Sequence, residues 1–183
     1  MSTLEERAEI WVEPYWNADH LLRTREWLLE LDPGAGEPAR LAALTHDMER
    51  HFPGGPVQDL SAWPEDVRDA EYRRLHSERS ARIVGDWLRG QRADGSLVEE
   101  VERLVVAHET GGGPDADLVQ AADSLSFLEV NPYVLVRWYT SGRCSRDRAK
   151  AQARWMLERI RVPAARELAK PLYEEAIAAV DRA

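Results

Sequence analysis

The sequence predicts an all-α protein whose residues 1–183 form a single domain. Apolar residues recur at helical spacing along most of the chain, and β-branched residues never alternate with polar ones over a useful length. A chain of 183 residues suits one domain and is long enough to bury a core. Prolines, glycines and capping residues divide the periodic stretches into segments of helical length.

The first half of the chain is expected to form four helices, at residues 3–12, 18–31, 38–50 and 64–89. Pro14 stops the first helix, and Asn17 or Asp19 is a suitable N-cap for the second. The second helix ends at the Asp-Pro-Gly turn of residues 32–34, and the third begins through Glu37 and Pro38. The prolines and paired glycines of residues 52–63 (FPGGPVQDLSAW) predict a long loop before the fourth helix.

The second half is expected to form five helices, at residues 97–109, 115–130, 133–139, 145–161 and 163–181. Ser96 is the predicted cap of the first of these, and the Gly-Gly-Gly-Pro run of residues 111–114 ends it. The Asn-Pro pair at residues 131 and 132 stops the next helix. We expect residues 18–130 to form the core of the domain, with the helices of residues 131–183 packed on it.

Composition narrows the classes of function. The net charge of −9 argues against general binding of nucleic acid, because phosphate backbones would be repelled. No run approaches the roughly 18–20 apolar residues that a membrane span needs, and the charged N-terminal segment lacks an export signal. Cys144 is the only cysteine, so an internal disulfide is excluded. We therefore expect a cytoplasmic protein with no membrane partner; the sequence makes no prediction of its oligomeric state.

One segment is basic although the chain is acidic. Between Arg137 and Arg161, seven arginines and Lys150 stand against Asp147 and Glu158. Such a segment usually forms a solvated helix surface, and less often it faces an anionic substrate. Both interpretations are open from the sequence.

Histidines and aspartates stand in an ordered set around the segment of residues 41–51 (LAALTHDMERH). The six residues of the set are His20, His46, Asp47, His76, His108 and Asp123. Several continue apolar helix stripes: His108 follows Leu104 by four residues, and Asp123 lies between Val119 and Phe127. No lysine or arginine lies on these stripes to pair with the aspartates. A single histidine of this kind usually belongs to an ordinary core, but the six together predict a site for divalent cations.

This pattern resembles the HD-domain metal-dependent phosphohydrolases over residues 20–130, and most of all the YqeK-like enzymes, which hydrolyse symmetrical dinucleoside tetraphosphates. The counterparts of their hallmark segments read HDMER at residues 46–50, LHS at 75–77, HETG at 108–111 and AD at 122–123. Arg50 replaces the lysine of that group, Glu109 replaces a threonine, and the loop after Arg50 differs. The departures leave the metal ligands intact and make the substrate uncertain.

The resemblance implies a helical bundle around two divalent metal ions, iron or manganese above all. His20, His46, Asp47 and Asp123 would hold one ion, and Asp47 would bridge to a second ion held by His76 and His108. It further implies hydrolysis of a phosphate ester or anhydride, in a small phosphorylated substrate such as a nucleotide, by a hydroxide that the metals activate.

Four residues are candidates for a catalytic role. Asp47 would bridge the metals, and Arg50 would clamp a phosphoryl group with its planar guanidinium. His51 would donate a proton to the leaving group or contact phosphate, although an exposed loop histidine is an equally good interpretation. Glu109 would orient a metal-bound water or a ligating histidine.

Two other classes share this ligand pattern. Some HD-domain proteins use a mixed-valent di-iron pair to cleave C–C or C–P bonds with oxygen, and their six ligands look the same in sequence. A non-catalytic module with structural metals, or a nucleotide sensor, is the third class. Iron content and oxygen consumption distinguish the second class from a hydrolase.

Overall fold

The computed structural model describes residues 2–183, and these residues form nine α-helices and one 3-10 helix without any strand. The elements are α1 (Leu4–Val12), α2 (Ala18–Leu31), α3 (Glu37–Thr45), η1 (Met48–His51), α4 (Val67–Gly90), α5 (Gly95–Ala107), α6 (Pro114–Val130), α7 (Pro132–Thr140), α8 (Arg146–Glu158) and α9 (Pro163–Arg182). The all-α prediction is confirmed. The predicted helix ends agree within three residues everywhere except at the end of α3.

The third helix is shorter than predicted, because α3 ends at Thr45 and the chain turns at His46 before it enters η1. In a continued helix the His46 carbonyl would accept from the Arg50 amide. Here it accepts a hydrogen bond from the Ser80 hydroxyl, while the Arg50 amide donates to Asp47 O at 3.1 Å. The hydrogen bond from Ser80 of α4 therefore takes the place of the next helical hydrogen bond, and His46 and Asp47 lie in the turn between α3 and η1.

The N-terminal cap of α5 also differs from the prediction. The side chain of Asp94, not Ser96, accepts the hydrogen bond of the capped turn, from the Ser96 amide at 2.9 Å. Asp94 and Ser96 are two residues apart, so both suit the composition of a cap. Because the cap is Asp94 and not Ser96, α5 begins at Gly95, two residues earlier than expected.

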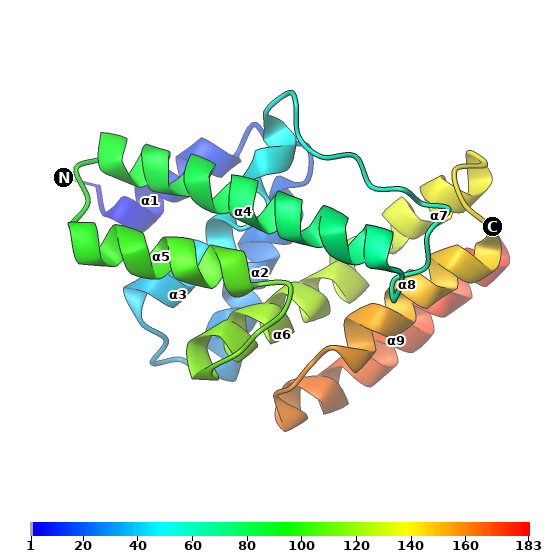
Figure 1. Ribbon diagram of the computed structural model, residues 1–183. Coiled ribbons are helices and arrows are strands. Elements are labelled where there is room, and N and C mark those ends of the chain that lie inside the picture. The colour runs from blue at the N-terminus through cyan, green and yellow to red at the C-terminus, as the bar shows by residue number, and fades with distance from the viewer. Residues whose placement is uncertain (1) are drawn as a thin grey trace.

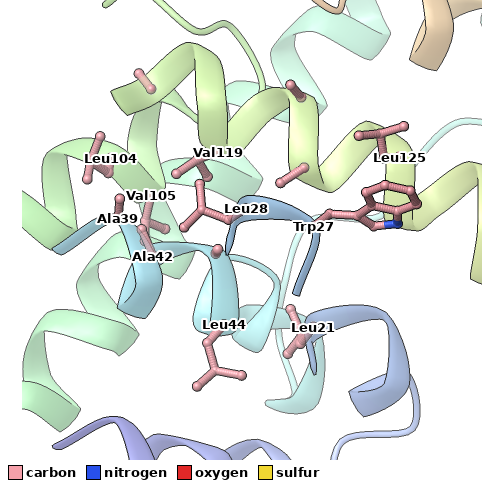
Figure 2. Packing of buried hydrophobic residues seen from close by; sticks show 14 of the residues in the cluster. Leu21, Trp27, Leu28, Ala39, Ala42, Leu44, Leu104, Val105, Val119 and Leu125 are labelled. Atoms are coloured by element: carbon pink, nitrogen blue, oxygen red, sulfur yellow. The ribbon is translucent and has the colours of Figure 1, made fainter. Parts of the chain in front are cut away.

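Side chains from all nine helices meet in one apolar core. Helix α2 packs along α6, α4 along α5, and α8 along α9, and α6 also contacts α9 (Figure 1). In the centre, Leu28 of α2, Ala42 of α3, Val105 of α5 and Val119 of α6 lie together (Figure 2). The C-terminal helices share this core, since Ala176 and Val180 of α9 belong to the same cluster as Leu28.

An ion-pair network attaches α1 to the bundle. The Glu5 carboxylate accepts hydrogen bonds from Arg25 of α2 at 2.9 Å and from Arg40 at 3.0 Å. Burial would raise the pKa of Glu5, but the two guanidinium groups outweigh this effect and lower the pKa from its ordinary value of 4.5.

Within residues 2–183, no helix has the length and apolar character that crossing a bilayer requires.

Candidate metal centre

The six predicted metal ligands come together in the interior of the bundle. His20 projects from α2, His76 from α4 and Asp123 from α6, whereas His46, Asp47 and His108 stand just beyond the ends of α3 and α5. Each of the six residues is at most 5% exposed. The inward placement that the helix stripes predict for His20, His76, His108 and Asp123 is therefore confirmed.

Two carboxylates connect three of the four imidazoles, those of His20, His46 and His76. Asp123 Oδ1 lies 3.2 Å from His20 Nε2 and 3.4 Å from His46 Nε2. Asp47 Oδ1 lies 2.9 Å from His76 Nε2 and 3.9 Å from His46 Nε2. Asp47 thus occupies the middle of the cluster, between the ring of His46 and the ring of His76.

In each of the four histidines of the cluster, the Nδ1 atom faces an oxygen at hydrogen-bond distance. The Nδ1 atoms of His46 and His108 face the backbone carbonyls of Ala43 at 3.0 Å and Val105 at 2.6 Å. A carbonyl can only accept, so both Nδ1 atoms carry the proton and each neutral ring keeps its lone pair on Nε2.

The other two rings are held by side chains. His20 Nδ1 faces Ser126 Oγ at 2.9 Å, and this hydroxyl donates its own proton to the His20 carbonyl, so its oxygen is free to accept. His76 Nδ1 faces Glu49 Oε1 at 2.8 Å. Anchoring of one nitrogen by a carbonyl or carboxylate is typical of metal-binding histidines, because it orients the ring and makes it more basic.

Three overlapping triads have ligand atoms within 4.8 Å of one another: His20, His46 and Asp123; His46, Asp47 and His108; and His76, His108 and Glu109. His46 and His108 each belong to two triads. The buried His46 Nε2 has no hydrogen-bond partner among the described residues, and a buried lone pair of this kind suits a cation. The donor set therefore fits a divalent metal, as predicted, and Glu109 joins it as an additional candidate ligand.

No arginine lies on the ligand stripes, but two arginines from elsewhere in the chain pair with the two aspartates. Arg50 Nη1 lies 2.6 Å from Asp47 Oδ2. Arg159, which comes from the C-terminal end of α8, binds Asp123 Oδ2 and lies 2.6 Å from Glu109 Oε2. Both arginines come from outside the four ligand helices, so the stripes could not reveal them. They occupy the Oδ2 atoms and leave Oδ1 of each aspartate facing the histidines.

These contacts shift the pKa of the buried carboxyls. Burial would raise the pKa of Asp123, but Arg159 and the nearby imidazoles hold it well below its usual range. For Asp47, burial is outweighed in the same way by Arg50 and His76. For Glu109, burial is outweighed by Arg159, and the pKa falls to about 2. All three are carboxylates at neutral pH, which is the form that binds cations.

The imidazoles respond to the same charges. Burial would lower the pKa of His46, but the Asp123 carboxylate outweighs it and raises the pKa. Burial lowers the pKa of His108, which has the weaker contact with a carboxylate, 3.6 Å from Glu109 Oε1. A metal ion at His46 would have to displace any proton on Nε2.

The cluster forms one end of a cavity of about 590 Å³. Arg50 and Glu109 line this cavity, as expected for groups that meet a substrate. His51 does not line it: the ring is exposed and packs edge-on against Tyr15 and Phe52. Trp63 lies at a separate pocket, whereas Trp16, Trp138 and Trp155 line the main cavity.

Sequence reasoning missed three groups at the centre, namely Glu49, Trp155 and Arg159. Glu49 is 1% exposed and connects His76 to Arg79, whose Nη1 lies 2.5 Å from Glu49 Oε2. Trp155 lies between the guanidinium groups of Arg73 and Arg159, at 4.5 Å and 4.6 Å from its ring. The one signal for Arg159 was its place in the basic segment, where seven arginines stand.

Comparisons with protein-family models, with curated proteins and with solved structures found no match for this chain. The resemblance to HD-domain enzymes therefore depends on the residue pattern alone. What the geometry supports by itself is a buried centre of histidines and carboxylates that could hold metal ions beside a large cavity.

Proposed function

We propose that this protein is a metal-dependent phosphohydrolase that acts on a phosphate ester or anhydride, such as a nucleotide, with two divalent cations in the centre described above. One observation carries the proposal. All four buried histidines have Nδ1 held by an oxygen, and all four direct Nε2 toward a carboxylate of the centre, Asp123, Asp47 or Glu109. A core of ordinary satisfied histidines has no need for this common orientation.

The triads suggest how the ligands divide. The triad of His20, His46 and Asp123 would hold one ion. For the other ion we propose Asp47 and His76, which lie 2.9 Å apart, together with His108, which shares one triad with Asp47 and another with His76. Imidazole nitrogen and carboxylate oxygen suit iron or manganese, and the HD-domain resemblance favours the same metals. Bound cations would supply a water molecule of lowered pKa and compensation for charge on the phosphoryl oxygens.

The chain's own residues would position the reactants. Arg50 lines the cavity with a side chain that is 32% exposed, so its guanidinium can hold a phosphoryl oxygen while it keeps Asp47 oriented. Arg159 also lines the cavity, but its side chain is only 6% exposed and pairs with both Asp123 and Glu109. In the reaction, a water oxygen bonds to phosphorus, the P–O bond to the leaving group breaks, and the leaving oxygen takes up a proton.

The low pKa of Glu109 limits its role. A carboxyl with a pKa of about 2 holds no proton near neutral pH, so Glu109 would accept hydrogen bonds and not act as the acid. In this position it would orient His108 or a water molecule, in agreement with the role expected from the sequence. We do not include His51 in the site, because it lies outside the cavity.

The test compares metal content and phosphate release in the wild type and in Asp47→Ala, after loading with Mn²⁺ or anaerobic Fe²⁺. We expect the wild type to hydrolyse members of a panel of phosphate esters, nucleotides and dinucleoside polyphosphates. Asp47→Ala should lose at least about a hundredfold in rate and bind less metal. Glu5→Gln is the control: it removes a carboxylate that also binds two arginines but neither lines the cavity nor belongs to a ligand triad.

Two results would overturn the proposal. Unchanged turnover and metal content in Asp47→Ala would exclude the assigned centre. Two irons per chain, with oxygen consumed in the presence of a polyol or phosphonate and no phosphate ester hydrolysed, would place the protein with the oxygenases.

A further inference from the structure

The cavity has a second polar end, away from the metal centre. Its wall there consists of α7 and the loop that leads to α8, with Tyr133, Trp138, Arg137 and Arg143 among the lining residues. This segment is unusual for so acidic a protein. The chain contains 33 aspartates and glutamates, yet none stands between residues 130 and 146.

Charge pairing separates the two ends of the cavity. Five carboxylates line it, and each has an arginine nitrogen within 4 Å: Asp47 with Arg50, Glu49 with Arg79, Asp69 with Arg73, and Glu109 and Asp123 with Arg159. Arg137 and Arg143 differ. Within residues 2–183 no carboxylate lies within 4 Å of either guanidinium, and neither guanidinium donates a hydrogen bond.

These two arginines are exposed, so they remain charged and meet a ligand with little loss of solvation. On a chain of net charge −9 they form a local positive region inside the cavity, which would attract an anion that the rest of the surface repels. Planar guanidinium groups suit phosphate in particular, because they donate paired hydrogen bonds.

We propose that the ligand of this cavity carries a second phosphate group, bound by Arg137 and Arg143 while the first lies at the metal centre. The inference rests on the proposed function for the first phosphate and names the substrate class: organic molecules with two separate phosphate groups, not simple monoesters. The aromatic rings of Tyr133 and Trp138 line the cavity together with these two arginines.

The test uses non-hydrolysable probes, so that binding is measured apart from catalysis. Long-chain α,ω-alkane bisphosphonates and alkyl monophosphonates of equal length are titrated calorimetrically into the Mn²⁺-loaded protein. We expect the best bisphosphonate to bind about tenfold more tightly than its monophosphonate. The preference should weaken as salt is added. Arg137→Gln/Arg143→Gln should abolish it without a change in monophosphonate affinity.

Arg82→Gln is the matched control, since Arg82 is an exposed arginine of α4 that lies outside the cavity. This variant should keep the full preference. Equal affinity of the two probe types for the wild type, or an equal loss in Arg82→Gln, would overturn the inference. Retained bisphosphonate preference in a protein that hydrolyses no phosphate ester would overturn the proposed phosphohydrolase and leave the second anion site in place.

Discussion

Substitution of Arg159 gives the sharpest test of how the negative charge of the buried carboxylates is compensated. The Arg159 guanidinium binds Asp123 and Glu109, and its Nε lies 2.8 Å from Ser124 Oγ. Arg159→Met keeps much of the aliphatic stem and removes the charge. In the metal-free protein two buried carboxylates then lose their cation. In the metal-loaded protein the ions compensate the same carboxylates, so we expect the variant to recover stability when metal is added.

The loss of unfolding free energy expected for Arg159→Met follows from the burial of the three groups. The side chains of Arg159, Glu109 and Asp123 are 6%, 10% and 7% exposed, close to the limit of a buried network. Removing one partner from a buried pair costs about 3–5 kcal/mol of unfolding free energy. For a protein of this size 1 kcal/mol shifts Tm by about 2–4 °C, so the metal-free variant should melt about 6–20 °C below the wild type.

Thermal and urea unfolding with EDTA, and then with Mn²⁺ at about a hundred times its Kd, measure both states. Metal at that level stabilises a binding protein by about 2.7 kcal/mol. The difference in unfolding free energy between wild type and Arg159→Met should narrow by at least about 1 kcal/mol when metal is added. The reason is that the metal ions compensate part of the negative charge that Arg159 no longer balances. Arg148→Met is the control: Arg148 is also buried in α8, but it binds Ala62 O and Gln152 outside the centre.

A gap that stays the same with and without metal would refute this reasoning, since Asp123 and Glu109 would then be insensitive to the ions. An equal rescue of Arg148→Met would refute it too, because general stabilisation would explain both variants.

Three further predictions test separate parts of the structure. Arg50→Ala should raise KM for a phosphate substrate about tenfold with the metals retained, measured by steady-state kinetics and metal analysis; loss of metal would instead assign Arg50 a structural role. Ser126→Ala removes the acceptor of His20 Nδ1 and should weaken metal affinity about tenfold to a hundredfold in a chelator competition; unchanged affinity would mean that His20 needs no anchor. Glu5→Gln should cost about 1 kcal/mol at neutral pH. Because the pKa of Glu5 is lowered on folding, the contribution of the carboxylate is present above its ordinary value of 4.5 and disappears as pH falls through the lower folded value. Urea unfolding at a series of pH values measures the difference, and a constant penalty down to acidic pH would contradict the ion-pair account.

The sequence predicted the helices well where local signals agree. Apolar spacing, prolines and glycines placed eight of the nine helices within three residues at both ends. The failure at α3 has a tertiary cause. The bond from Ser80 to the His46 carbonyl comes from α4, and no local feature of residues 41–51 announces it.

The candidate ligands could also be inferred from the sequence, because a polar residue on an apolar helix stripe must point inward. The same logic could not find Arg159. Its position matters only because α8 folds back beside α6 and brings one of seven arginines to Asp123.

The sequence by itself therefore determined the helical class and the inward placement of His20, His76, His108 and Asp123, since both follow from spacing along a single helix. Only the tertiary structure decided which arginines compensate the carboxylates, which ring nitrogen of each histidine is anchored, and that residues 131–146 form the far wall of the cavity. These features depend on contacts between helices far apart in the chain, and periodicity within one helix carries no information about its neighbours.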